Sequence, residues 1–184
     1  MANAQFARRI ENRAQELRRK LQLGPADVLN PFTLADVMGV KVLSFDGVEG
    51  LSTAHRRRLI AEDPDGWSAG TLVLNGLPIV VLNPTHADTR RRATLMEELS
   101  HVHLRHKPSE LTIMREGVAF RSFKQSQEKQ AFGVGAAALI PLTLLKHAHA
   151  AAMQRTVLAT HCGVSTKLVS FREQITGLRL AAAS

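Results

Sequence analysis

The sequence predicts an α+β protein in which helices gather on one side of a small antiparallel sheet. Apolar residues recur at helical spacing near the N-terminus and through the second half of the chain, whereas the alternating, β-branched segments lie between these two regions. The 184 residues, of which 45% are hydrophobic and 22% charged, are enough for one folded domain with a substantial core.

Helical periodicity and helix-ending residues locate the expected helices. They cover residues 4–22, 31–38, 88–106 and 126–139, followed by two short helices within residues 155–178. Pro141 should break or kink the helix that precedes it. The apolar run of residues 131–145 is too short to span a bilayer, so it is interpreted as a buried helix and no membrane role is expected.

Alternating β-branched segments locate the strands. They are expected at residues 40–45, 71–74 and 78–82. Asn75-Gly76 lies between the last two segments and is the strongest hairpin signal in the chain. Residues 46–66 are rich in Gly, Asp and Arg and are expected to be irregular, with Trp67 anchoring this loop, while residues 109–123 give a mixed signal.

The expected organisation is a main domain over residues 1–150 and a small helical tail over residues 151–184 packed on it. A single cysteine, Cys162, excludes an internal disulfide and a multi-cysteine zinc site, and it is expected to be a small buried residue. The N-terminus lacks the apolar stretch of a secretory signal. Together these features indicate a reducing, cytoplasmic location.

The net charge of +8 and the pI near 10.5 favour an acidic partner, which includes nucleic acid bound through a basic surface. The chain has no tyrosine and only 4% aromatic residues, which argues against a surface that stacks single-stranded bases. The arginines occur in short clusters and are interpreted mainly as solvated faces.

The helix expected over residues 88–106 contains the residues with the clearest chemistry. Glu97 and His101 are four residues apart and therefore lie on one face of a helix. Gluzincins use side chains at i and i+4 to hold a metal and a carboxylate at i+1 as general base. Glu98 occupies the i+1 position, whereas Glu97 occupies i, where the usual motif has His. Glu128 is the natural third ligand, because the glycines and alanines that follow it permit close helix packing.

The pattern alone leaves other interpretations open. Adjacent glutamates and a histidine are common on charged helices that bind no metal. Glu98 and His101 also form the Glu-x-x-His half-site of carboxylate di-iron bundles, but the chain contains no second copy.

The remaining histidines are not expected to be ligands. His103 and His106 are turned about 200° and about 140° from His101 around a helix, so they should lie on its surface or support the ligands through hydrogen bonds. His147 and His149 are expected to face solvent.

Residues 77–106 resemble the core of the ImmA/IrrE family: a strand ending in Asn, a loop, an Arg, and then a helix with His-Glu-x-x-His and a further His. Residues 128–141 resemble the second motif of that family, in which a Glu opens a helix that ends in a Leu-Leu-Met-Pro-like run. Residues 32–40 resemble the segment before the family's sheet. The resemblance implies a zincin-like minimal metallopeptidase domain with a small sheet, a helical bundle and a short helix-turn-helix-like tail.

The resemblance implies roles for four residues. Glu98 corresponds to the general base, and His101 and Glu128 correspond to two of the metal ligands. Glu97 stands in the place of the first histidine ligand. The implied ion is Zn²⁺. Two carboxylate ligands make Mn²⁺ or another divalent ion more competitive and weaken the Lewis acidity of the site. An active enzyme, a metal site without peptidase activity and an inactive scaffold all remain open.

The resemblance implies a metal-dependent endopeptidase acting on a regulatory protein of the repressor (helix-turn-helix) or antitoxin type, in a stress response, a mobile element or toxin–antitoxin control. The alternative is a catalytically inactive zincin-like scaffold that binds a protein regulator or DNA.

The tail has the Ala-x-x-x-Gly-Val-Ser spacing of a helix-turn-helix over residues 158–172. Gly163 permits the tight turn and Ser165 can cap the following helix. Lys167 and Arg172 would then be available to DNA. The other interpretation, a helical pair that packs on the domain, is favoured.

Glu97 and His101 should project towards Glu128 whether or not a metal is bound. Arg90, Arg92 or another basic group is expected to neutralise these carboxylates, because unpaired buried charges are costly. A cleft is expected between this helix and the edge of the sheet, where a peptide could add as a strand.

Overall fold

The computed structural model describes residues 2–107, 110–113, 119–122 and 124–181. It confirms the α+β class. The helices are α1 Ala2–Lys20, α2 Pro31–Val37, α3 Thr53–Arg57, α4 Asp88–His103, α5 Gln125–Leu139, α6 Leu142–Ala150, α7 Arg155–Cys162 and α8 Thr166–Thr176. The strands are β1 Lys41–Leu43, β2 Ala69–Leu74, β3 Leu77–Leu82, β4 Glu110–Ile113 and β5 Ala119–Ser122.

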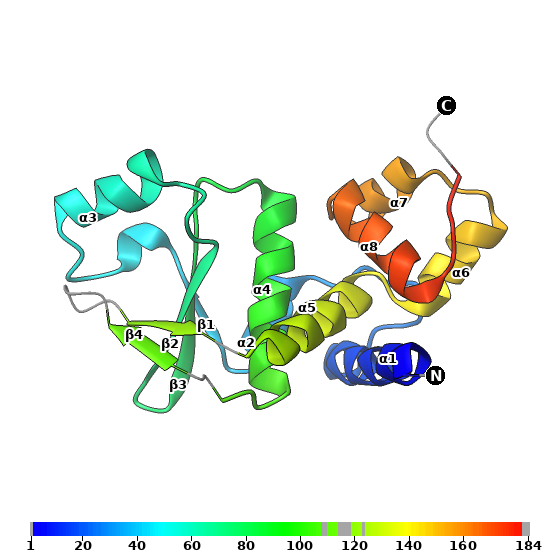
Figure 1. Ribbon diagram of the computed structural model, residues 1–184, viewed down its shortest axis with the longest axis horizontal. Helices are drawn as coiled ribbons and strands as arrows, with labels where there is room; N and C mark the ends of the chain where they lie inside the picture. Colours follow the sequence, from blue (N-terminus) through cyan, green and yellow to red (C-terminus); the bar gives the residue numbers. More distant parts are fainter. Residues whose placement is uncertain (1, 108–109, 114–118, 123, 182–184) are drawn as a thin grey trace.

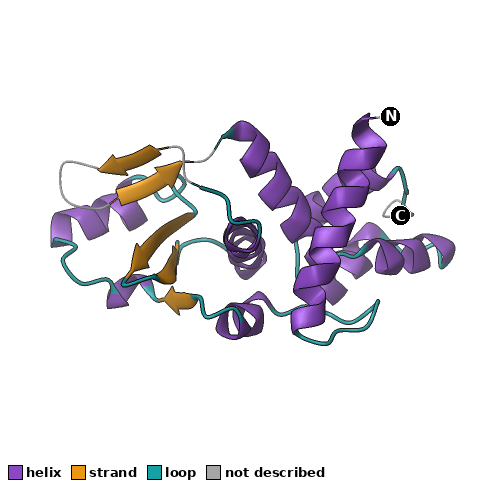
Figure 2. Cartoon of the chain, turned by 90° about the horizontal axis from the view of Figure 1, so that it is seen from below, coloured by secondary structure: helices purple, strands orange, loops and turns teal. Residues whose placement is uncertain are grey.

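Helix α4 is the centre of the arrangement. Figure 1 shows the strands and α3 on one side of α4, and α1 with α5 to α8 on the other. Figure 2 shows α4 end-on between the strands and the remaining long helices. Side chains on different faces of α4 therefore reach either the sheet or the helices.

The main sheet has the strand order β1-β3-β2 and is mixed. The hairpin prediction is confirmed: β2 and β3 are antiparallel, and Asn75 and Gly76 have φ values of 51° and 81°. The expectation of a wholly antiparallel sheet is wrong, because β1 runs parallel to β3. Side-chain alternation indicates which face of a strand is buried but not the direction of the strand. A second sheet pairs β4 with β5 in the stretch that gave a mixed signal.

The segment expected to be irregular, residues 46–66, has more regular structure than predicted. It contains α3 and the short helical turns Phe45–Gly47 and Arg58–Glu62. Ser52 caps α3 by accepting a hydrogen bond from the His55 N–H. The anchoring role of Trp67 is confirmed, since its indole N–H donates to the Leu59 carbonyl at 2.9 Å.

The hydrophobic core surrounds α5, which packs against both α1 and α4, and it continues into α6, α7 and α8. Ile10, Ala14 and Leu17 of α1 are buried in it, as the helical spacing predicted. Helix α5 lies close to α4 at Gly135, where a Cβ atom would lie 3.1 Å from the Met96 carbonyl group. The expected close packing of the small residues in α5 is therefore confirmed at this position.

The apolar run of residues 131–145 is buried but forms parts of two helices rather than one. Helix α5 ends before Pro141 and α6 begins after it, with an angle of 54° between them. In the described part of the chain no single helix is long and apolar enough to cross a membrane, whereas this bent pair would meet that criterion by length and composition.

Three charged side chains bind the backbone at this break and are called the Glu11 clamp (Glu11, Arg18 and Arg172). Arg18 donates to the Ala138 carbonyl and Arg172 to the Ile140 carbonyl, both at 2.9 Å. Glu11 accepts from the Leu142 N–H at 3.3 Å and forms an ion pair with Arg172.

The tail has the turn geometry that was predicted. Gly163 adopts a left-handed conformation with φ of 63°, and Ser165 caps α8 by accepting from the Leu168 N–H. The proposed availability of Arg172 to DNA is wrong, because its side chain is fully buried in the Glu11 clamp. Cys162 is buried as expected, and burial raises the pKa of its thiol to about 11. The division into residues 1–150 and 151–184 stays a prediction.

Candidate metal centre

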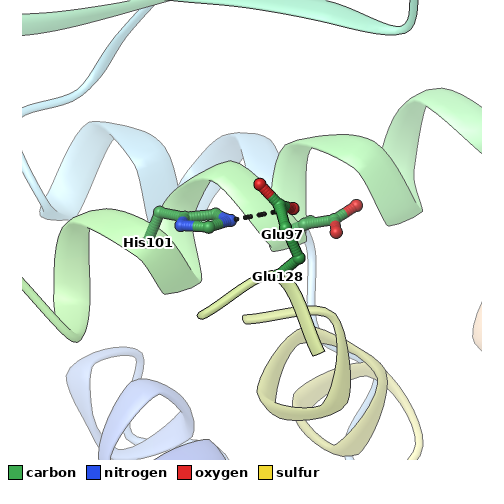
Figure 3. Close-up of side chains that lie close together, drawn as sticks. All are labelled: Glu97, His101 and Glu128. Atoms are coloured by element: carbon green, nitrogen blue, oxygen red, sulfur yellow. Dashed lines mark ion pairs between the residues drawn. The ribbon is translucent and has the colours of Figure 1, made fainter. Parts of the chain in front are cut away.

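Two helices supply the candidate site. Glu97 and His101 lie one turn apart on α4, and Glu128 lies in the first turn of α5. Their possible ligand atoms are all within 4.8 Å of one another, and Figure 3 shows the three side chains converging. The structure thus brings together the residues expected to bind metal, while their role as ligands stays a prediction. We call them the metal-centre cluster.

The donor set and its spacing fit a divalent ion. The His101 Nε2 atom lies 3.5 Å from Glu128 Oε2, the contact drawn as a dashed line in Figure 3. Two ligands that are each about 2.1 Å from a tetrahedral ion are separated by about 3.4 Å. A divalent cation would also offset the negative charge of the two carboxylates.

Burial and like charge shift the protonation of the metal-centre cluster. Burial, together with the charges of Glu128 and Glu98, raises the pKa of Glu97 to about 7. Burial and the nearby His106 lower the pKa of His101 to about 4. The His101 imidazole is therefore neutral at pH 7, which is the form that binds metal.

Glu98 projects from the same helix towards the sheet. Its Oε2 atom accepts a hydrogen bond from the Thr71 hydroxyl of β2 at 2.6 Å. Thr71 was not identified from the sequence, because its position depends on how β2 packs against α4. The role of Glu98 as general base stays a prediction.

His106 lies behind His101 rather than on the helix surface. Helix α4 ends at His103 instead of His106, and Arg105 has a positive φ of 54°, so the chain turns back. The two Nδ1 atoms of His101 and His106 are 3.1 Å apart, and His106 Nε2 is 3.2 Å from Gln130 Oε1. His106 therefore supports His101 through a hydrogen bond, one of the two roles expected for it.

The three other histidines whose positions were predicted make contacts or face solvent outside the metal-centre cluster. His103 Nε2 is 3.0 Å from Glu16 Oε2 and so connects α4 to α1. His147 and His149 are exposed on α6, as expected.

The expectation that Arg90 or Arg92 neutralises the cluster is wrong, whereas neutralisation by another basic group stays a prediction. Arg90 binds Asp65 and the Ser68 hydroxyl, and Arg92 donates to the Leu29 carbonyl. Both precede Glu97 by at least five residues, which corresponds to about 7 Å along a helix. At that distance their side chains contact loops near the beginning of α4.

A scan against protein-family models matches residues 35–173 to the IrrE N-terminal-like domain of peptidase family M78. The match covers about three quarters of the chain and includes both helices that form the metal-centre cluster. The chain belongs to this family. No curated protein matched the chain in a separate search. An IrrE-like domain is metallopeptidase-like in function, which agrees with the convergence of two carboxylates and one imidazole on a possible metal position.

Proposed function

We propose that this IrrE-like protein is a metal-dependent endopeptidase that acts on a regulatory protein of the repressor or antitoxin type. The observation that supports this proposal most strongly is the convergence of Glu97, His101 and Glu128, with Glu98 next to the first of them.

In the proposed reaction, Glu97, His101 and Glu128 hold the ion. When bound, a divalent ion supplies Lewis-acid chemistry: it polarises the peptide carbonyl and lowers the pKa of water. Glu98 takes a proton from the attacking water and returns it to the amine that leaves. The Thr71 hydroxyl holds the Glu98 carboxylate in one orientation.

The proposed ion is Zn²⁺, with Mn²⁺ or another divalent ion as competitor. Imidazole suits Zn²⁺, whereas carboxylates also suit Mn²⁺ and Mg²⁺. Two anionic ligands donate more negative charge than one, so the ion should be a weaker Lewis acid than one bound by two histidines and one glutamate. We therefore expect slower turnover than for a protein with His at position 97.

The proposed substrate class follows from the family and from charge. The net charge of +8 favours an acidic protein partner over a basic one. Burial of Arg172 removes one of the two tail residues that had suggested DNA contact. Proteins encoded by neighbouring genes are the first candidates to test as substrates.

The decisive experiment combines metal analysis with cleavage of such a candidate. We expect the parent protein to bind about one divalent ion and to cut the candidate. Glu98→Gln should retain the ion and lose about 10²–10⁴-fold in rate, the usual contribution of a general base. The matched control is Glu62→Gln, which changes an exposed glutamate outside the metal-centre cluster. Cleavage by Glu98→Gln at the parental rate would remove the proposed mechanism.

The Glu97→His variant tests separately whether the glutamate at position 97 binds the ion. It should increase Zn²⁺ affinity and turnover if Glu97 holds the ion. A parent protein that neither binds metal nor cleaves, beside a Glu97→His variant that does both, would indicate an inactive scaffold.

A further inference from the structure

A hydrogen-bonded chain connects the metal-centre cluster to the second turn of α5. It runs from His101 Nδ1 to His106 Nδ1 at 3.1 Å, and from His106 Nε2 to Gln130 Oε1 at 3.2 Å. The two imidazole rings also pack edge to face, with centroids 5.0 Å apart. Two side chains, His106 and Gln130, therefore fix the orientation of the His101 ring.

The acceptor at the end of this series of hydrogen bonds, Gln130 Oε1, decides which of its atoms donate and which accept. An amide oxygen only accepts, so Gln130 Oε1 requires a proton on His106 Nε2. With a single ring proton on His106, its Nδ1 atom is left as an acceptor. His101 Nδ1 must then be the donor, and the lone pair of His101 is on Nε2.

We propose that His106 and Gln130 are positioning residues that hold His101 as its Nδ1–H tautomer, so that the Nε2 lone pair faces Glu97 and Glu128. The proposal rests on the proposed metal site and adds how that site is prepared. Histidines that bind metals usually donate their second ring N–H to a partner, which fixes the tautomer and the ring orientation.

The position of Nε2 shows what this tautomer means for ion binding. Nε2 is the His101 atom that lies 3.5 Å from Glu128 Oε2. A lone pair directed towards a carboxylate is unfavourable unless a cation or a proton lies between them, so this tautomer favours ion binding. The opposite tautomer would place an N–H there and would have to lose its proton before binding an ion.

The backbone conformation around these residues also supports the proposed orientation of the His101 ring. The turn at Arg105, with φ of 54°, returns the chain so that the His106 N–H donates to the His101 carbonyl at 3.0 Å. Gln130 follows Glu128 by two residues on α5. The same hydrogen-bonded chain thus orients the ligand on α4 and connects it to the helix that supplies Glu128.

The first test uses the metal-free protein and ¹⁵N nuclear magnetic resonance of the imidazole nitrogens at pH 7. We expect His101 to show a protonated Nδ1 and an unprotonated Nε2. In Gln130→Leu this preference should be lost, because His106 no longer has its acceptor. A parent protein with His101 protonated on Nε2 would overturn the proposal.

The second test measures Zn²⁺ affinity by competition with a chelator. Losing a hydrogen-bond partner of a metal-binding histidine costs about 10–100-fold in affinity, and we expect a loss in this range for His106→Phe and Gln130→Leu. His106→Asn keeps an acceptor near the Nδ1 position and should recover most of the affinity. Gln130→Glu keeps only acceptors and should bind Zn²⁺ at least as tightly as the parent.

The matched control for the added charge in Gln130→Glu is Ser126→Glu, one turn earlier on α5 and exposed. If Ser126→Glu strengthens binding as much as Gln130→Glu does, charge rather than the acceptor explains the effect. Unchanged affinity in both His106→Phe and Gln130→Leu would also contradict the proposal. If the parent binds no metal, the proposed function fails, but the tautomer measured in the metal-free protein still decides this inference.

Discussion

The metal-centre cluster and the Glu11 clamp lie at opposite ends of α5. At the N-terminal end, Glu128 faces Glu97 and His101, and burial beside like charges raises the pKa of Glu97 to about 7. At the C-terminal end, Glu11 faces Arg172, and both side chains also bind the backbone between α5 and α6.

The two regions show how charges that stabilise the fold differ from charges that prepare a binding site. In the Glu11 clamp, Glu11 pairs with Arg172, and the three side chains bind backbone groups on both sides of Pro141, so the ion pair forms within the protein and needs no ligand. In the metal-centre cluster, two carboxylates are held close together, which costs free energy that a bound cation recovers. A group of ionisable residues that raises a carboxyl pKa is therefore the stronger indication of a binding site.

The largest expected effect comes from breaking the Glu11 clamp. Arg172→Met removes the ion pair, leaves the Glu11 carboxylate without its counter-charge and leaves the Ile140 carbonyl without this donor, so we expect a loss of about 3–5 kcal/mol in the free energy of unfolding. Urea denaturation measures this loss. The control is Arg57→Ala, which removes an exposed pair with Glu62 and should cost less than about 1 kcal/mol. Equal losses in both variants would contradict the structural role of the clamp.

The second-largest expected effect is a gain in stability rather than a loss, and it depends on pH. With a folded pKa of about 7 against an ordinary value of 4.5, Glu97 binds more protons in the folded than in the unfolded protein between these pH values. Its contribution to stability therefore falls as pH rises through this window, and is fully lost above pH 7.

We expect Glu97→Gln to stabilise the metal-free protein by about 2–3 kcal/mol at pH 8 and by little at pH 4.5. Thermal denaturation across this range, with a chelator present, measures the difference. Adding Zn²⁺ should stabilise the parent more than the variant, because the variant lacks one anionic ligand. A constant difference between the two proteins from pH 4.5 to pH 8 would exclude Glu97 as the titrating group.

A smaller effect is expected where α5 approaches α4. In Gly135→Ala the new methyl group meets the Met96 carbonyl, a backbone group that cannot move alone, so we expect a loss of about 1–3 kcal/mol. The variant should also bind Zn²⁺ more weakly, because α5 carries Glu128. Ser126→Ala is the control, since it changes an exposed side chain on the same helix and should leave the stability nearly unchanged. Similar stability of both variants would show that the helix contact does not limit packing.

Much of the fold could be predicted because local rules determine it. The buried face of α1, the Asn75-Gly76 hairpin and the Gly163 turn each follow from residue spacing or from backbone preferences. The direction of β1 could not be predicted, because it depends on pairing with β3, a segment far from it in the sequence. The pairing of β4 with β5 joins neighbouring segments, but residues 109–123 lack a clear strand pattern, so it was not predicted.

The candidate site also combines features that the sequence could predict with features that it could not. Glu97 and His101 could be placed on one face because a helix has a fixed period. Glu128 was identified because the small residues that follow it permit close helix packing, and the family resemblance led to the same residue. His106 was placed on the helix surface or behind the ligands, because the spacing could not show that α4 ends before it. Arg172 was assigned to the exposed surface as one possibility, because the sequence does not show that Glu11, 161 residues away, lies beside it.

The smallest expected effect concerns Thr71, which contacts neither of the two regions compared above but holds Glu98 beside the first. Thr71→Val preserves the shape of the side chain and removes the hydroxyl that donates to Glu98 at 2.6 Å. We expect a loss of about 1 kcal/mol in stability, the usual net value of one hydrogen bond.

If Glu98 is the general base, kcat should fall while KM stays unchanged, because the variant misplaces a group that acts in the transition state. Thr71→Ser keeps the hydroxyl and should recover the rate. A Thr71→Val protein with the parental kcat would show that this hydrogen bond does not position the base.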